Sequence, residues 1–184
     1  MTTLRTITQE ELKLILDNHK IWLEDKDKGE RADLNAVDLN AVDLKGVNLK
    51  GADFGYANLK GADFSYANLK GADLTGAHLN IANLSFAILI GANLKGANLN
   101  DANLRNATLE RANLEKATLE HASLTSADLR RADLRNSKLS YTDLKNANFT
   151  GAYLKGACLK GANFWDAILY DINLTDNVGI KLNN

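Results

Sequence analysis

The sequence predicts an all-β solenoid, in which the chain winds as a polygonal coil, with an α-helix that covers its N-terminal end. Every fifth residue from Leu34 through Leu174 is Leu or Phe, which makes 29 consecutive five-residue repeats without an insertion. Ala stands two residues before the Leu or Phe in 23 of these 29 repeats. The residue between them is Asp nine times and Asn eleven times, and the last residue of a repeat is Gly ten times.

A period of five excludes a regular helix and a straight strand as the source of this pattern. On an α-helix, five residues advance by about 500°, so the Leu positions would spread around the helix. On a straight strand, side chains alternate with a period of two, so successive Leu would lie on opposite faces. We therefore expect one turn per repeat. An extended triplet points Ala and Leu inward and Asp or Asn outward, and the last two residues form a corner.

The number of repeats in one coil stays open at this point. Coils of four repeats would stack Lys95 beside Glu115 and Glu115 beside Arg135. Coils of three repeats would instead stack Glu120 beside Arg135, and similar pairs recur along the chain for both arrangements. Charge pairing therefore favours neither three nor four repeats per coil.

The unit Ala-(Asp/Asn)-Leu-x-x, repeated over 145 of the 184 residues (29 repeats of five), resembles the pentapeptide-repeat family, which is common in cyanobacteria. The resemblance implies a right-handed quadrilateral parallel β-helix with four repeats per coil. It therefore implies about seven coils and a rod roughly 35 Å long at the usual strand spacing. It also implies that the repeated Leu, Phe and Ala positions are structural and not catalytic.

The N-terminal segment predicts a helix over 8–24 that is followed by a charged linker. Thr8 and Glu11 have the spacing of a capping box. An apolar face at helical spacing follows; it consists of Leu12, Ile15, Leu16, His19 and Leu23. We divide the chain into a capping helix with its linker (1–30), the repeat β-helix (31–175) and a C-terminal tail (176–184).

The end coils of a solenoid need a cover, because their apolar interior otherwise meets water. We therefore expect the helix to lie over the first coil, where Val37, Val42 and Val47 replace the usual Ala. Leu14 and Ile21 lie on the opposite face of the helix. We interpret them as partly buried or simply exposed, and a contact with a second chain is the alternative.

Apolar side chains also gather near the C-terminal end, at positions that are polar or small in other repeats. They are Trp165, Ile168, Tyr170 and Ile172. Two interpretations stay open. These residues form the contact of a homodimer through the C-terminal coils, as the family resemblance implies for some members, or Val178, Ile180 and Leu182 fold back over the last coil.

A second apolar group lies in the middle of the repeats. Ile88 takes the place of Asp or Asn, and Phe86 and Ile90 occupy outward corner positions. With four-sided coils, Tyr66 would lie under Phe86, and Ile81 is one repeat away. Exposed contiguous apolar patches often mark interaction sites. We therefore hypothesise an interaction patch of these five residues, with neutral drift on a tolerant surface as the alternative.

Columns of carboxylates are a further consequence of four-sided coils. Asp33, Asp53 and Asp73 would stack, as would Asp43 and Asp63. Stacked like charges repel, and a cation or a basic partner could relieve the repulsion. We favour the other interpretation, in which these Asp side chains bond to nearby backbone groups.

The sequence predicts no catalytic, metal or cofactor-binding residues. Nucleophilic catalysis needs a Cys or Ser beside a base, and the His nearest to Cys158 in sequence is His121. A shared metal site is also not expected, because His19 lies on the predicted helix while His78 and His121 would lie two coils apart. One Cys excludes a disulfide framework and a cysteine-rich zinc site.

Charge and targeting signals narrow the function classes. The net charge is −1, with 22 basic and 23 acidic residues, which argues against a protein held to nucleic acid by phosphate contacts. Segment 1–30 contains no apolar run long enough for a signal peptide or a membrane span. We therefore expect a cytoplasmic protein without direct nucleic-acid or membrane contacts.

These observations predict a non-catalytic structural or protein-interaction module with an unknown protein partner. The family resemblance supplies an alternative, a DNA-mimicking rod that binds DNA gyrase and confers fluoroquinolone resistance. Imitating the phosphate backbone requires dense negative charge. Residues 91–140 instead carry eight basic and six acidic groups, a net charge of +2, so we disfavour this alternative.

Overall fold

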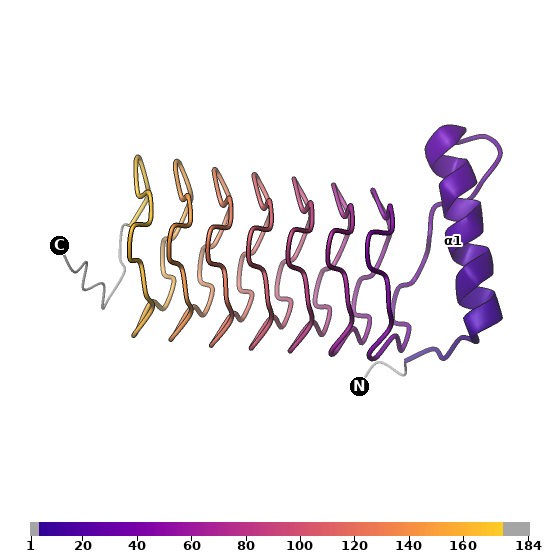
Figure 1. Ribbon diagram of the computed structural model, residues 1–184, viewed down its shortest axis with the longest axis horizontal. Coiled ribbons are helices and arrows are strands. Elements are labelled where there is room, and N and C mark those ends of the chain that lie inside the picture. Colours follow the sequence, from indigo (N-terminus) through magenta and orange to yellow (C-terminus); the bar gives the residue numbers. More distant parts are fainter. Residues whose placement is uncertain (1–3, 175–184) are drawn as a thin grey trace.

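The structure is a rod of stacked coils with one helix at its N-terminal end (Figure 1). It is a computed structural model that describes residues 4–174 of the 184. The helix, α1 (Gln9–Glu24), lies beside the first coil, and the described chain ends at the opposite end of the rod. The expected solenoid with a helix at its N-terminal end is thereby confirmed.

Each coil contains four repeats. Parallel β-bridges join the middle residue of a repeat to the middle residue four repeats later, from the pair Asp33 and Asp53 to the pair Tyr153 and Asn173. These bridges occur singly, so each side of a coil is a very short strand. The amide of Leu34, for example, donates to the carbonyl of Asp53 at 2.8 Å. The fold is thus a quadrilateral β-helix, and the open question of three or four repeats per coil is settled.

The corners are tight turns that close with a hydrogen bond across two residues, as when the amide of Ala57 donates to the carbonyl of Phe54 at 3.1 Å. The last residue of every repeat from Ala36 to Asp171 has a positive φ, between 52° and 73°. Ten of these residues are Gly and eighteen are not. The left-handed region costs an ordinary residue roughly 1–2 kcal/mol. Six of the eighteen are Asn or Asp, which tolerate this region, and the regular ladder between coils holds the other twelve in a conformation that they do not prefer.

The core is a continuous column inside the coils. The inward Leu, Phe and Ala side chains from Ala32 to Leu159 are almost entirely buried. Phe54 and Phe64 meet edge to face with ring centroids 5.7 Å apart. Asp and Asn in the middle of each triplet point outward, as the pattern predicted. Their side-chain oxygens commonly accept from the amide two residues later, as Asp63 does from Ser65 at 2.8 Å.

The N-terminal end is covered by two elements. Arg5 pairs with the first coil, because its amide donates to the carbonyl of Ala36 and its carbonyl accepts from the amide of Asp38, both at 2.8 Å. In α1, Leu12 and His19 are buried, whereas Leu14 and Ile21 are exposed.

The beginning of α1 has the predicted capping box. The Thr8 hydroxyl accepts from the Glu11 amide at 3.1 Å, and the Glu11 carboxylate accepts from the Thr8 amide at 2.7 Å. Further along, the linker passes so close to α1 that a Cβ atom on Gly29 would lie 2.3 Å from the backbone nitrogen of Trp22. Gly29 therefore permits the return of the chain to the first coil.

Candidate functional site

The predicted mid-rod patch contains a stacked aromatic pair. The rings of Tyr66 and Phe86 are parallel within 1°, and their centroids are 4.9 Å apart. Both occupy the same corner in successive coils, and both side chains are exposed. Ile88 follows on the adjoining face with 38% of its surface exposed, and Ile90 lies at the next corner, partly buried. The coil geometry therefore brings four of the five predicted residues to one face and its edges.

Ile81 lies apart from the other four. It occupies the corner before the one that holds Phe86, so the triplet that contains Asn83 separates them. Its side chain lies beside Gly61, where an added Cβ would meet the Ile81 Cδ1 atom at 3.8 Å. Ile81 is exposed, but it belongs to a different edge of the rod.

The apolar residues near the C-terminal end fall into two groups. Trp165, Ile168 and Tyr170 point outward and are at least half exposed. Ile172 takes the inward position of the usual Ala and packs partly buried against the core, as do Phe164, Leu169 and Leu174. The predicted dimer contact therefore comprises a side surface and an end surface. Residues Val178, Ile180 and Leu182, which belong to the alternative interpretation, lie outside the described residues.

The four-sided coil places the two outward apolar groups on one face of the rod. Ile88 and Ile168 lie four coils apart, and an unbroken series of bridges connects them. We call Phe86, Ile88 and Ile90 the middle ledge, and Trp165, Ile168 and Tyr170 the end ledge. We call the whole surface, with both flanking corners, the isoleucine face. It comprises residues 45–51, 65–71, 85–91, 105–111, 125–131, 145–151 and 165–171.

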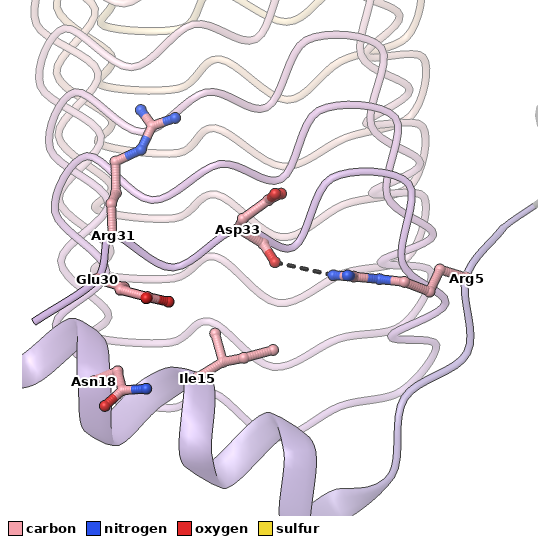
Figure 2. A pocket seen from close by; sticks show the side chains of 6 residues that line it. All are labelled: Arg5, Ile15, Asn18, Glu30, Arg31 and Asp33. Atoms are coloured by element: carbon pink, nitrogen blue, oxygen red, sulfur yellow. Dashed lines mark hydrogen bonds between the residues drawn. The ribbon is translucent and has the colours of Figure 1, made fainter.

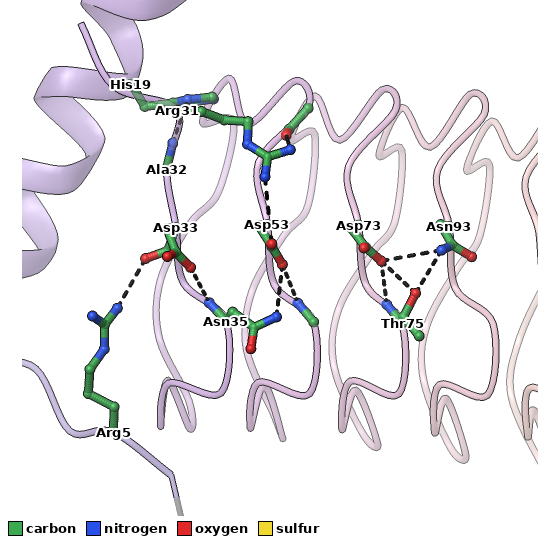
Figure 3. Close-up of polar contacts among 12 residues, drawn as sticks. Arg5, His19, Arg31, Ala32, Asp33, Asn35, Asp53, Asp73, Thr75 and Asn93 are labelled. Carbon is green, nitrogen blue, oxygen red and sulfur yellow. Dashed lines mark hydrogen bonds and ion pairs between the residues drawn. The ribbon is translucent and has the colours of Figure 1, made fainter. Parts of the chain in front are cut away.

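The Asp columns have local partners and do not form a cation site. Asp33, Asp53 and Asp73 lie in a row on one face (Figure 3). Asp53 accepts from the Gly55 amide at 2.9 Å and from the Asn35 amide group at 3.2 Å. Within residues 4–174, no group of three or more His, Cys, Asp or Glu side chains could hold a metal ion.

The carboxylate of Asp63 shows the balance in these columns. Burial raises the pKa of Asp63. The hydrogen bonds from Ser65 and the charge of Lys45 together lower it by more than burial raises it, so the pKa lies below its usual value. The carboxylate is therefore charged at neutral pH. The neighbouring coil adds a side-chain hydrogen bond from Asn83 at 3.2 Å. The preferred interpretation of the Asp residues, bonding to nearby groups, agrees with these contacts.

Cys158 is exposed, and its nearest polar side chain is a hydroxyl. The Cys158 Sγ and Ser140 Oγ atoms are 3.3 Å apart, and this hydrogen bond is the main cause of a lowered thiol pKa. His121 stacks on Tyr141, with ring centroids 5.3 Å apart. Neither arrangement brings a base to the thiol, so the geometry gives no support to nucleophilic catalysis.

A cavity that the sequence did not predict lies between α1 and the first coil (Figure 2). It has a volume of about 210 Å³ and is lined by Arg5, Ile15, Asn18, Glu30, Arg31 and Asp33. The Arg5 guanidinium crosses it to donate to the Asp33 carbonyl at 3.1 Å. The charged side chains around it are of both signs, so it favours neither an anion nor a cation.

Next to this cavity, His19 fastens α1 to the first coil. Its Nδ1 atom accepts from the Ala32 amide at 3.1 Å (Figure 3). Its buried Nε2 atom has no hydrogen-bond partner among the described residues. Burial, and next the charge of Arg31, lower the pKa of His19 below its ordinary value. His19 is therefore neutral at physiological pH, with the proton on Nε2.

No helix among residues 4–174 is long and apolar enough to cross a membrane. None of the curated proteins compared with the chain matches it. Among solved structures, the chain is similar to QnrB1, a plasmid-mediated fluoroquinolone resistance protein, with 19% identity and a TM-score of 0.49. That alignment covers 79% of this chain and 88% of QnrB1.

Two cyanobacterial structures are more similar in sequence. HetL, a pentapeptide repeat protein involved in heterocyst differentiation regulation from Nostoc sp. strain PCC 7120, is 34% identical over 80% of this chain and 83% of HetL, with a TM-score of 0.31. A second pentapeptide repeat protein from Nostoc is 30% identical to this chain, and the alignment covers 70% of this chain and 84% of the Nostoc protein, with a TM-score of 0.28.

The family described as pentapeptide repeats (8 copies) matches most of the chain. The matched residues are 30–65, 43–80, 82–115, 102–140 and 127–166. This range coincides with the coils that the bridges define, and the repeats of this family are generally non-catalytic. The chain belongs to the pentapeptide repeat family.

Proposed function

We propose that this protein is a non-catalytic interaction module, in which a rigid rod presents the middle ledge and Tyr66 to a protein partner. The observation that carries the proposal is the exposed Tyr66–Phe86 stack beside Ile88. These side chains stand where most other repeats place polar or small residues. A half-exposed apolar surface gains free energy when a partner removes it from water, at about 25 cal/mol per Å². We also expect the cytoplasm as the compartment, because the single Cys cannot form a disulfide within the chain and disulfides are rare in cytosolic proteins.

A pull-down from the native cell tests this proposal. The bait is the wild-type chain or a variant with Phe86→Ser, Ile88→Ser and Ile90→Ser. We expect the variant to lose partners that the wild-type chain retains. A matched control with Tyr56→Ser and Tyr141→Ser removes exposed aromatic side chains from two other corners and should retain them. Unchanged partners with the triple variant would reject the middle ledge as the binding site.

Homodimerisation through the C-terminal coil is a second proposal. Its support is the end of the last described coil, where inward side chains are only partly buried and would lose contact with water in a dimer. These residues are Phe164, Leu169, Ile172 and Leu174. Sedimentation velocity of the wild-type chain and of an Ile172→Asp variant tests it. We expect a dimer that the substitution converts to a monomer. A wild-type monomer at high concentration would end this proposal.

The DNA-mimicking alternative receives no support from the charge distribution. A gyrase supercoiling assay with the purified protein separates it from the interaction module. We expect no inhibition at micromolar concentration. Inhibition at that concentration would favour the alternative.

A further inference from the structure

The isoleucine face carries a net positive charge. Its seven segments contain eight basic and four acidic residues, a net charge of +4. The rest of the chain carries −5, of which −4 lies in segment 1–44, with six basic and ten acidic residues. Two of the four acidic residues, Asp166 and Asp171, flank the end ledge. The remaining six segments have a net charge of +6.

Between the two ledges, the few carboxylates are already paired. Arg130 lies 2.6 Å from Asp128 and 3.4 Å from Glu110. These two carboxylates are the only acidic groups in the three segments of the face that lie between the ledges. Arg131 and Lys145 are exposed and form no ion pair within the described residues. The surface between the ledges therefore presents unneutralised positive charge.

We infer that the isoleucine face binds an acidic segment of a partner protein that lies along the rod and places one apolar side chain on each ledge. Four coils separate Ile88 from Ile168, which is about 19 Å at a spacing of about 4.8 Å per coil. A helix of about 13 residues covers this distance. This inference rests on the proposed function and adds the end ledge and the chemistry of the partner.

The same surface is less suited to other occupants. A second copy of the chain would bring two basic faces together, and like charges repel. Ile88 and Ile168 offer no hydrogen bonds to a nucleic-acid base. Asp166 and Asp171 would repel the headgroups of an anionic membrane at the end ledge, and for the same reason the acidic residues of the partner segment must lie between the two ledges.

Selection from a yeast-displayed library of random peptides, each long enough to span both ledges as a helix, tests the inference without a known partner. The wild-type chain is the positive target. The counter-target carries Ile88→Asn and Ile168→Asn, which restore the usual residue of the repeat and should keep the fold. We expect the enriched peptides to carry Asp and Glu between two apolar residues.

The best enriched peptide is then synthesised, and its affinity is measured by fluorescence anisotropy. We expect Ile88→Asn and Ile168→Asn to weaken binding about tenfold each, because each removes a partly exposed apolar contact. A variant with Arg131→Glu and Lys145→Glu should weaken binding about fivefold in low salt and less in high salt, because salt screens charges. Tyr153→Asn, which replaces an exposed middle residue on another face, should leave the affinity unchanged.

Several results would overturn the inference. They are the enrichment of neutral or basic peptides, the enrichment of no peptide that discriminates the counter-target, and peptide binding that Ile168→Asn leaves intact. Binding of phosphatidylserine vesicles or of a single-stranded oligonucleotide that requires both isoleucines would also overturn it, as would wild-type self-association that requires them. If the pull-down partners depend on Phe86, Ile88 and Ile90 but not on Ile168, Arg131 or Lys145, the proposed function stands and this inference fails.

Discussion

At the N-terminal end of the rod, Leu34 is completely buried, whereas Leu174, on the same face of the last described coil, is only partly buried. The two residues occupy the same position of the repeat. The difference lies in what covers them, because α1 and the segment around Arg5 close the first coil. The inward residues from Phe164 to Leu174 pack only partly buried against the core.

The repeat by itself accounts for burial in the middle of the rod, whereas burial at an end depends on residues outside the repeat. Each coil buries its neighbour, so the middle of the rod needs nothing beyond the five-residue unit. A terminal coil has a neighbour on one side only. The N-terminal end meets this need with a capped helix, a close linker at Gly29 and a buried His19, none of which belongs to the repeat.

The largest expected effect comes from truncating the two equivalent leucines. Leu34→Ala should lower the free energy of unfolding by about 3 kcal/mol, because it leaves a cavity in a closed core. Leu174→Ala should lower it by about 1 kcal/mol, because less buried surface is lost. Urea unfolding followed by circular dichroism measures both. Equal losses would show that the tail or a second copy covers the last coil in solution.

A second test concerns the passage of the linker over α1. Gly29→Ala should destabilise the N-terminal end by about 2 kcal/mol, because the added Cβ would overlap the backbone of Trp22 and Asn18. Gly91→Ala is the control, since nothing lies within 4 Å of its Cβ position and only its φ of +63° opposes alanine; it should cost about 1 kcal/mol. Hydrogen exchange in α1 reports the first change. Equal exchange in the two variants would contradict the tight passage.

Acid should destabilise the N-terminal end of the rod more than the C-terminal end. The pKa of His19 is lowered in the folded state, so the unfolded chain binds more protons below its ordinary pKa of about 6.5. The stability of this end is therefore complete above that pH and falls as the pH drops toward the folded pKa, by at most about 1.4 kcal/mol per pH unit.

Hydrogen exchange in α1 between pH 7 and pH 5 measures this loss, with exchange rates corrected for their own pH dependence. His19→Gln supplies the control, because an amide does not titrate in this range. The control should show no acid-dependent loss of protection in α1. An equal acid sensitivity of the variant would assign the loss to another group.

The sequence predicted most of the fold because its signals are local. The inward Leu and Ala, the outward Asp and Asn, and the capping box of Thr8 and Glu11 each depend on residues a few positions apart. The number of repeats per coil depends on contacts between distant residues. Charge pairs that suit three repeats and four repeats were equally available, and the structure uses the second kind, as in Lys95 and Glu115 at 2.8 Å. The positive φ of the twelve corner residues other than Gly, Asn and Asp had no local signal either.

The candidate site was predictable as separate groups only. Phe86 and Ile88 stand out because they break the repeat, and so do Trp165 and Ile168. Their common face follows from the coil of four repeats, since a coil of three would have put Ile88 and Ile168 on different faces. The cavity at Arg5 and Arg31 was missed because its lining combines three segments that lie apart in the sequence, namely the segment around Arg5, α1 and the start of the first coil.

The smallest expected effect concerns the capping box of α1. Thr8→Ala removes the oxygen that accepts from the Glu11 amide and should cost about 1 kcal/mol, while Thr8→Ser should retain most of the stability. In a solenoid each coil contacts only its neighbours, so the loss should appear as faster hydrogen exchange in α1 and the first coil. The coil around Phe149 should exchange at its wild-type rate. Equal acceleration at both ends would show that the rod unfolds as a single unit, and the cover of the N-terminal end would then stabilise the last described coil as well.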